Sequence, residues 1–127
     1  MLIVALVLAG LAALLHVYIW VLESLVWSTK GRKVFGISAE QAAANRQFAY
    51  NQGFYNLFLA IGTGAGVAFA AGDCRWGIPL IVFGTGSMLG AAIVLVTDDR
   101  TQVRGAVVQG TLPLLALLGL ALHVALR

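Results

Sequence analysis

The chain has 127 residues, of which 61% are hydrophobic and only 10% are charged. Charged residues make up about 25% of a typical soluble domain, so this composition excludes a water-soluble globule. A single cysteine excludes an internal disulfide, and the net charge of +3 is better explained by basic residues that flank membrane spans than by nucleic-acid binding.

Four apolar segments are each long enough to cross a hydrocarbon core of about 30 Å. Short turns connect the last three of them, which places neighbouring helices antiparallel. The sequence therefore predicts an all-α fold, a polytopic up-down bundle of four transmembrane helices that forms one domain over residues 1–127. The expected spans cover residues of about 2–28, 48–71, 77–97 and 103–126, with a loop at 29–44.

The first span opens on an apolar run that starts at Leu2 and continues past Trp20. A secretory signal peptide has a basic region before its apolar core and a cleavage site after it, and the segment has neither. We therefore expect this segment to remain in the mature protein.

The loop between the first two spans carries signals for the end of one helix and the start of the next. Gly31 and Gly36 predict the end of the first helix. Ser38 followed three residues later by Gln41 is the capping-box pattern. The second helix is therefore expected to begin near Ala39, before it enters the membrane.

Basic residues decide the expected orientation. By the positive-inside rule, the side that carries more lysine and arginine faces the cytoplasm. We therefore expect an integral protein of the bacterial inner membrane, in contact with the lipid bilayer, with both termini outside and with the 29–44 loop and the turn between the last two spans in the cytoplasm. Arg75 and Arg127 lie on the outer side, and the cytoplasmic side holds Lys30, Arg32, Lys33, Arg46, Arg100 and Arg104.

Two ionisable residues lie inside the first span, where each costs about 2.5 to 3.5 kcal/mol on insertion scales. His16 and Glu23 are seven residues apart, which is two helical turns, and Trp20 and Trp27 lie on the same stripe. Such a ridge is expected to face protein rather than lipid.

Polar residues on the second helix complement this ridge. Asn45, Gln52 and Asn56 fall within about 40° of one another at 100° per residue, and Asn51 and Tyr55 extend the arc. They reach the depth of Glu23 and His16 on an antiparallel neighbour, and Gln109 can join them from the fourth span. The sequence therefore predicts a polar pocket between the first two transmembrane helices.

We interpret this pocket as a site that binds or converts a small lipophilic molecule. Glu23 and His16 would act as acid and base, Trp20 and Trp27 as walls, and the amides as orienting groups. Whether the protein is an enzyme stays open. The alternatives are a small transporter or proton-coupled channel, a non-catalytic subunit of a larger complex, and amides that only hold helices together.

Other features give weaker signals. The spacing of His16 and Glu23 matches no helical metal motif, so no metal site is expected, and the sequence identifies no cofactor. Small residues recur at four-residue spacing, as in Gly86 and Gly90 or Ala60 and Gly64, which allows helices to approach closely. We expect a homo-oligomer.

At these residues the chain resembles a small four-span membrane family of bacteria and fungi, a domain of unknown function numbered thirteen-oh-four. The resemblance covers nearly the whole chain, and its most specific part is Asn-Gln-Gly-x-Tyr-Asn-x-Phe-Leu-Ala at 51–60. It implies a four-helix membrane protein and brings no reaction with it. The matching positions are His16, Glu23 and Trp27, residues 33–36, 49–60, 90–92 and 108–110, and Pro113.

Overall fold

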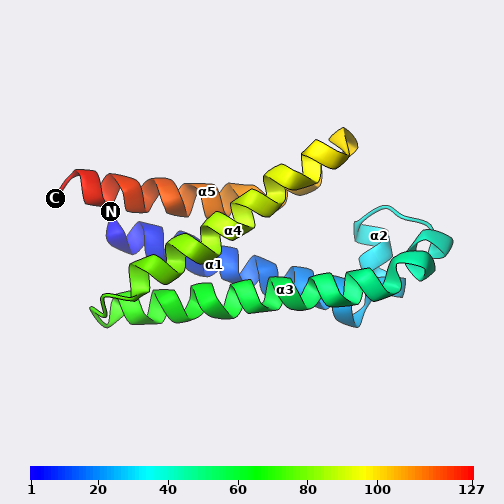
Figure 1. Ribbon diagram of the computed structural model, residues 1–127, viewed down its shortest axis with the longest axis horizontal. Coiled ribbons are helices and arrows are strands. Elements are labelled where there is room, and N and C mark those ends of the chain that lie inside the picture. The colour runs from blue at the N-terminus through cyan, green and yellow to red at the C-terminus, as the bar shows by residue number, and fades with distance from the viewer.

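The computed structural model describes all residues, 1–127, and consists of helices joined by short turns, without strands. Its first and last spans are apolar over Leu2–Leu25 and Arg100–Ala125, and all four spans are long enough to cross a membrane. The chain is therefore an integral membrane protein, and the predicted all-α bundle is confirmed. The four long helices (Figure 1) are α1 (Leu2–Trp20), α3 (Ala39–Ala71), α4 (Gly77–Asp98) and α5 (Val103–Ala125).

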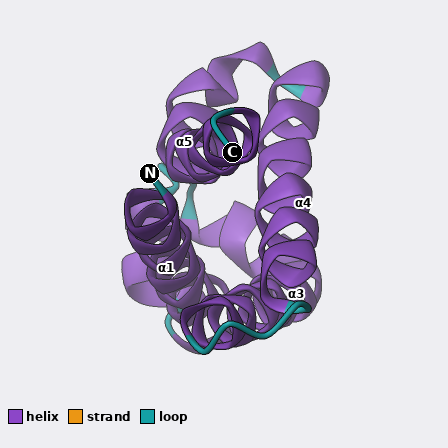
Figure 2. Cartoon of the chain, turned by 90° about the vertical axis from the view of Figure 1, so that its left-hand side faces the viewer, coloured by secondary structure: helices purple, strands orange, loops and turns teal.

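The four helices form a ring in which each packs against its two neighbours. Seen from the end that carries both termini, the order around the ring is α1, α3, α4, α5 (Figure 2). We call this end of the bundle the terminal half. The other end, which carries α2 (Arg32–Val34) and the turn at Asp99, is the loop half.

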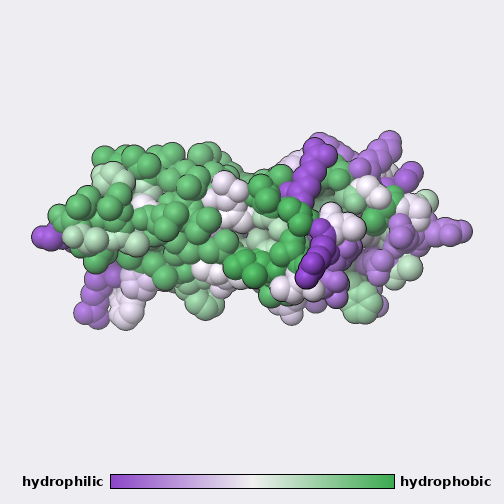
Figure 3. Space-filling view, turned by 90° about the horizontal axis from the view of Figure 1, so that it is seen from above, coloured by the Kyte–Doolittle hydropathy of each residue, from purple (hydrophilic) through white to green (hydrophobic).

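Small residues make the contacts between helices. Ala5, Ala9 and Ala116 are fully buried, whereas large apolar side chains such as Phe83, 72% exposed, point outward. Figure 3 shows hydrophobic residues covering the terminal half and hydrophilic ones gathered at the loop end. Lipid tails are as apolar as leucine, so membrane helices associate through close packing of small residues rather than through burial of large ones.

The connection after α1 differs from the prediction that Gly31 ends the first helix. The chain continues through two π-helical turns, Val21–Leu25 and Trp27–Gly31, and then α2. Gly31 is buried inside the second turn, where a Cβ would overlap the Leu22 carbonyl. A side chain is therefore excluded at Gly31 by the tight turn itself, and the helical region ends at Gly36, whose φ is +67°.

The predicted capping box is present at the start of α3. The Ser38 hydroxyl accepts from the Gln41 backbone N–H at 3.1 Å, and the Gln41 side chain accepts from the Ser38 N–H at 3.0 Å. The helix then runs for 33 residues, about 50 Å at 1.5 Å per residue. About twenty of these residues suffice to cross the hydrocarbon core, so roughly the first dozen residues of α3 extend beyond that core.

The pair α4–α5 diverges from α3 toward the loop end (Figure 1). Asp99 starts the turn between the two helices, and hydrogen bonds from the side chain and backbone N–H of Thr101 hold the pKa of its carboxyl below the usual value. A short 3-10 helix, Arg100–Gln102, leads into α5, which continues through the buried Pro113.

Candidate functional site

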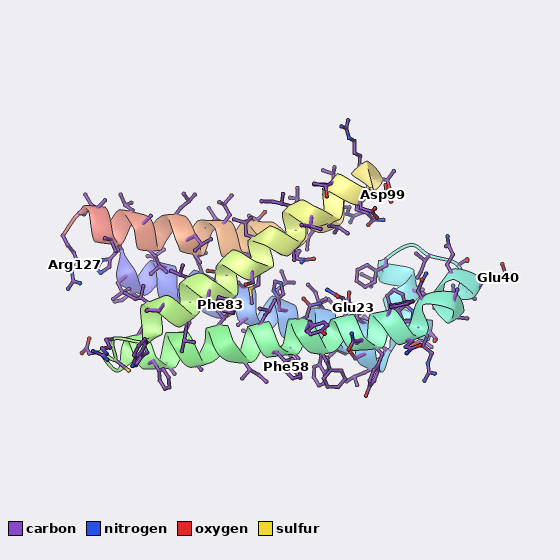
Figure 4. The ribbon with its side chains drawn as sticks, viewed as in Figure 1. Glu23, Glu40, Phe58, Phe83, Asp99 and Arg127 are labelled. Carbon is purple, nitrogen blue, oxygen red and sulfur yellow. The ribbon has the colours of Figure 1, made fainter.

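A hydrogen bond between Glu23 and Asn56 is the centre of the site. Asn56 Nδ2 donates to Glu23 Oε2 at 2.8 Å, across 33 residues of sequence. Asn56 is only 6% exposed, and its Nδ2 also lies 3.3 Å from the Gln52 carbonyl oxygen. Figure 4 shows Glu23 alongside α3, in the angle between α3 and the departing α4. The bond uses one carboxylate oxygen and leaves Oε1 for another donor.

The backbone around Glu23 is distorted from the α-helix. Val26 N–H donates to the Val21 carbonyl at 3.1 Å, and Gly31 N–H donates to the Val26 carbonyl at 2.8 Å. These i to i−5 bonds form two π-helical turns, separated at Val26 by φ −129° and ψ 30°. π-Helical turns are rare in proteins, and those that occur are often found at functional sites.

Gly53 and Ser24 bring the distorted end of α1 onto α3. A Cβ on Gly53 would overlap the Ser24 hydroxyl and lie 3.0 Å from Glu23 Cβ. The Ser24 hydroxyl donates to the Tyr50 carbonyl of α3 at 2.8 Å. The close approach therefore depends on Gly53, which the sequence analysis named only as part of the 51–60 motif, and on Ser24, which it did not single out. The position of Ser24 next to the intramembrane carboxylate was a signal for its role.

The two tryptophans of the predicted ridge do different things. Trp27 Nε1 donates to the Ala42 carbonyl at 2.9 Å, and its ring lies 5.6 Å from the Phe35 ring. Trp20 packs edge-on against Phe54 with ring centroids 5.9 Å apart, while its Nε1 is buried without a partner. The ridge assumed α-helical geometry through residue 27. The π-helical turns break that periodicity, and Trp27 binds the start of α3 instead of lining the site.

His16 is fully buried one turn before the end of α1. Its Nδ1 lies 2.9 Å from the Ala12 carbonyl oxygen. A carbonyl can only accept, so Nδ1 carries the proton and Nε2 of a neutral ring presents a lone pair. Nε2 has no partner. His16 and Glu23 are separated by about 10 Å along the helix at 1.5 Å per residue, so they do not form a contacting pair.

The structure brings only Asn56, of the polar residues expected on α3, to the first helix. The reason is that the inward face of α3 is made mainly of small residues, among them Ala42, Ala49, Gly53 and Ala60. Gln109 of α5 is half-buried, and no hydrogen bond joins it to the Glu23 site. The exposed residues are Asn45, whose amide donates to the Gln41 carbonyl, and Asn51, Gln52 and Tyr55.

Two buried threonines were also missed by the sequence analysis. The Thr85 hydroxyl donates to the Ile81 carbonyl at 2.6 Å. The Thr63 hydroxyl is fully buried against Gly84 and has no partner. A buried polar atom without a hydrogen bond costs about 1 to 3 kcal/mol. The interior therefore contains three such atoms, on His16, Trp20 and Thr63.

Two apolar grooves lie away from these residues. One, of about 310 Å³, runs between α4 and α5 in the loop half and includes Leu89 and Val107 in its walls. The other, of about 560 Å³, runs between α1 and α3 in the terminal half, from Leu2 to Gly10. Neither groove is lined by Glu23 or Asn56.

A comparison with known protein families gives a match over most of the chain. The family model described as "Protein of unknown function (DUF1304)" matches residues 10–121. No curated protein and no solved structure matches the chain.

Proposed function

The chain belongs to the DUF1304 family of proteins of unknown function, and we propose that it binds a small lipophilic molecule at the Glu23 end of the α1–α3 interface. The observation that carries this proposal is the bond from Asn56 to Glu23, which orients a half-buried carboxylate inside a membrane span. An ionisable group in such a place is expensive and is generally functional.

The free polar atoms describe what such a molecule would carry. Glu23 Oε1 and His16 Nε2 accept hydrogen bonds, while Trp20 Nε1 donates one. A ligand with a hydroxyl or amine group would donate to Glu23, and its apolar body would lie against Trp20 and Phe54. His16 lies deeper along the same helix, where it can accept from a second donor of a longer ligand. Glu23 and His16 are also the groups with which the site could move protons.

Binding has more support than conduction through the monomer. Beyond His16, toward the terminal end, the interior is filled by the hydrocarbon cluster that includes Ala5, Ala9, Ala70 and Ile81. A solute or proton that entered from the loop end would meet no polar group past this point. A transporter or channel would need a second route, so we rank this function below ligand binding.

The proposal includes an orientation. Six basic residues lie at the loop end or in the adjoining turn, and two at the terminal end. The positive-inside rule then supports a cytoplasmic loop half and outer termini. In this orientation, which suits a bacterial inner membrane, the Glu23 site faces the cytoplasmic leaflet.

Self-association is also part of the proposal. A Cβ added at Gly62, Gly64, Gly86 or Gly90 would meet no atom within 4 Å. These glycines are thus not used by the monomer, unlike Gly66, Gly77 and Gly84, which contact a neighbouring helix. Open glycines on membrane helices favour a close approach of a second copy.

The test is to purify the full chain from membranes and to identify copurified lipophilic molecules by mass spectrometry of an organic extract. Glu23→Gln keeps the shape of the side chain and removes its charge. A hydrogen bond to a charged group contributes about 1.5 to 3 kcal/mol, so we expect bound ligand to fall about tenfold or more. Glu40→Gln makes the same change at an exposed position and should leave the ligand unchanged. Equal amounts of ligand in the wild type and in Glu23→Gln would overturn the proposal.

A further inference from the structure

The groove between α1 and α3 in the terminal half is open to lipid and has one charged residue at its mouth. Leu2, Leu6 and Gly10 of α1 form one wall, and Val67 and Ala70 of α3 form the other. Asp73, in the turn after α3, also lines it. The groove is therefore apolar along its length, with a carboxylate at one end, and it is separate from the Glu23 site.

The length of the groove matches one leaflet of a bilayer. From Leu2 to Gly10 the helix rises about 12 Å at 1.5 Å per residue. Half of a hydrocarbon core of about 30 Å is about 15 Å. At the deep end, a Cβ on Gly10 would meet no atom within 4 Å. The groove thus has the depth of an alkyl chain that enters at the membrane surface, and the missing side chain of Gly10 keeps its inner end open.

The turn fixes the carboxylate at the surface end. Asp73 has φ +56°, a left-handed conformation that aspartate tolerates better than most residues. The next residue closes the turn, because Cys74 N–H donates to the Phe69 carbonyl at 2.8 Å. The basic side chain two residues after Asp73, Arg75, does not line the groove. Its guanidinium lies over the Trp76 ring, 4.9 Å from the ring centroid.

We propose that this groove binds one acyl chain of a phospholipid whose headgroup ends in a primary ammonium, as in phosphatidylethanolamine. The ammonium donates a charge-assisted hydrogen bond to Asp73, and the chain lies between α1 and α3 down to Gly10. A lipid with a glycerol headgroup and a net negative charge brings no cation to Asp73, and its phosphate is repelled by the carboxylate. The charge of the headgroup therefore determines which phospholipid the groove prefers, and contacts with the acyl chain keep that lipid bound.

Native mass spectrometry of the full chain tests this selection. The protein is released from detergent in the presence of equal amounts of phosphatidylethanolamine and phosphatidylglycerol with identical acyl chains. Asp73 is exposed, and an ion pair at an exposed carboxylate is weak, so the wild type should retain the ethanolamine lipid about two- to fivefold better. Asp73→Asn should abolish the preference while still retaining lipid.

Gly10→Leu should reduce retention of both lipids, because leucine fills the inner end of the groove. Ala121→Leu creates the same side chain, with one added carbon fewer, at an exposed position of α5 outside the groove and should retain lipid like the wild type. Equal retention of the two lipids by the wild type would overturn the proposal, as would unchanged binding by Gly10→Leu or equal loss in Ala121→Leu. The groove lies apart from Glu23, so either result leaves the ligand test of the Glu23 site unaffected.

Discussion

The terminal half and the loop half of the bundle differ in how their interiors are filled. In the terminal half, four helices meet on a hydrocarbon cluster in which Ala5, Ala9 and Ala116 are fully buried. In the loop half, α4 and α5 diverge from α3 (Figure 1), and the interior presents Glu23 and the unpaired Trp20 N–H. A close-packed interior resists any inserted atom, whereas unpaired polar atoms gain from a partner. In the interior, close packing is therefore concentrated in the terminal half and the polar ligand site in the loop half, while the lipid groove of the terminal half lies on the outer surface of the bundle.

The largest effect on stability is expected in the terminal half, where the helices leave no space for an added atom. In Gly77→Ala, the new Cβ would lie 2.6 Å from Ala70 Cα, so the helices must separate, at a cost of about 1 to 3 kcal/mol. Gly10→Ala adds the same atom with nothing within 4 Å, so it should be neutral or stabilising by up to about 1 kcal/mol. Thermal unfolding in detergent measures both. Similar loss of stability in the two variants would refute close packing at Gly77.

A smaller effect should separate the two tryptophans of the loop half. Trp27→Phe removes the hydrogen bond to the Ala42 carbonyl and should cost about 1 kcal/mol of stability without changing bound ligand. Trp20→Phe removes an N–H that has no partner in the protein. We expect a smaller loss of stability and less copurified ligand in Trp20→Phe. Unfolding measurements and ligand extraction on both proteins decide, and the reverse pattern would contradict our assignment of roles.

The two buried threonines should show an effect no larger than that of the tryptophans. Thr85→Val removes a hydrogen bond to the Ile81 carbonyl and should cost about 1 kcal/mol. Thr63→Val removes a buried hydroxyl without a partner, so it should be neutral or slightly stabilising, because valine has nearly the same shape. Unfolding free energies compare the pair. Equal destabilisation would mean that the Thr63 hydroxyl is bonded after all, for example to an ordered water.

The sequence was sufficient to predict the four spans and the start of α3, because both depend on local signals. Hydropathy over about twenty residues defines a span, and the capping box at Ser38 and Gln41 needs only four residues. The contact between Glu23 and Asn56 was also within reach, because antiparallel helices place residues of equal depth side by side.

The rest of the site depends on departures from ideal helix geometry. The exposed positions of Asn51 and Tyr55 follow from which face of α3 carries small residues, and five polar groups on one arc suggested another face. The π-helical turns at Glu23 and Trp27 accompany the close approach of Ser24 and Glu23 to Gly53. A tertiary contact of this kind produces no periodic pattern in the sequence, so the distortion of the helix could not be predicted.

The excess length of α3 makes the bundle sensitive to bilayer thickness. Counting twenty residues back from the end of α3 at Ala71 reaches Gln52, where the exposed amides of Asn51 and Gln52 form a collar. Moving these amides into hydrocarbon is unfavourable, so they limit how deeply α3 can enter the hydrocarbon core. They thereby fix the depth of Asn56, which lies one turn further into the membrane. A thicker membrane would pull the collar inward or straighten a tilted helix. A thinner one would bring the Glu23 carboxylate toward water, so lipid composition itself tunes the polarity around the site.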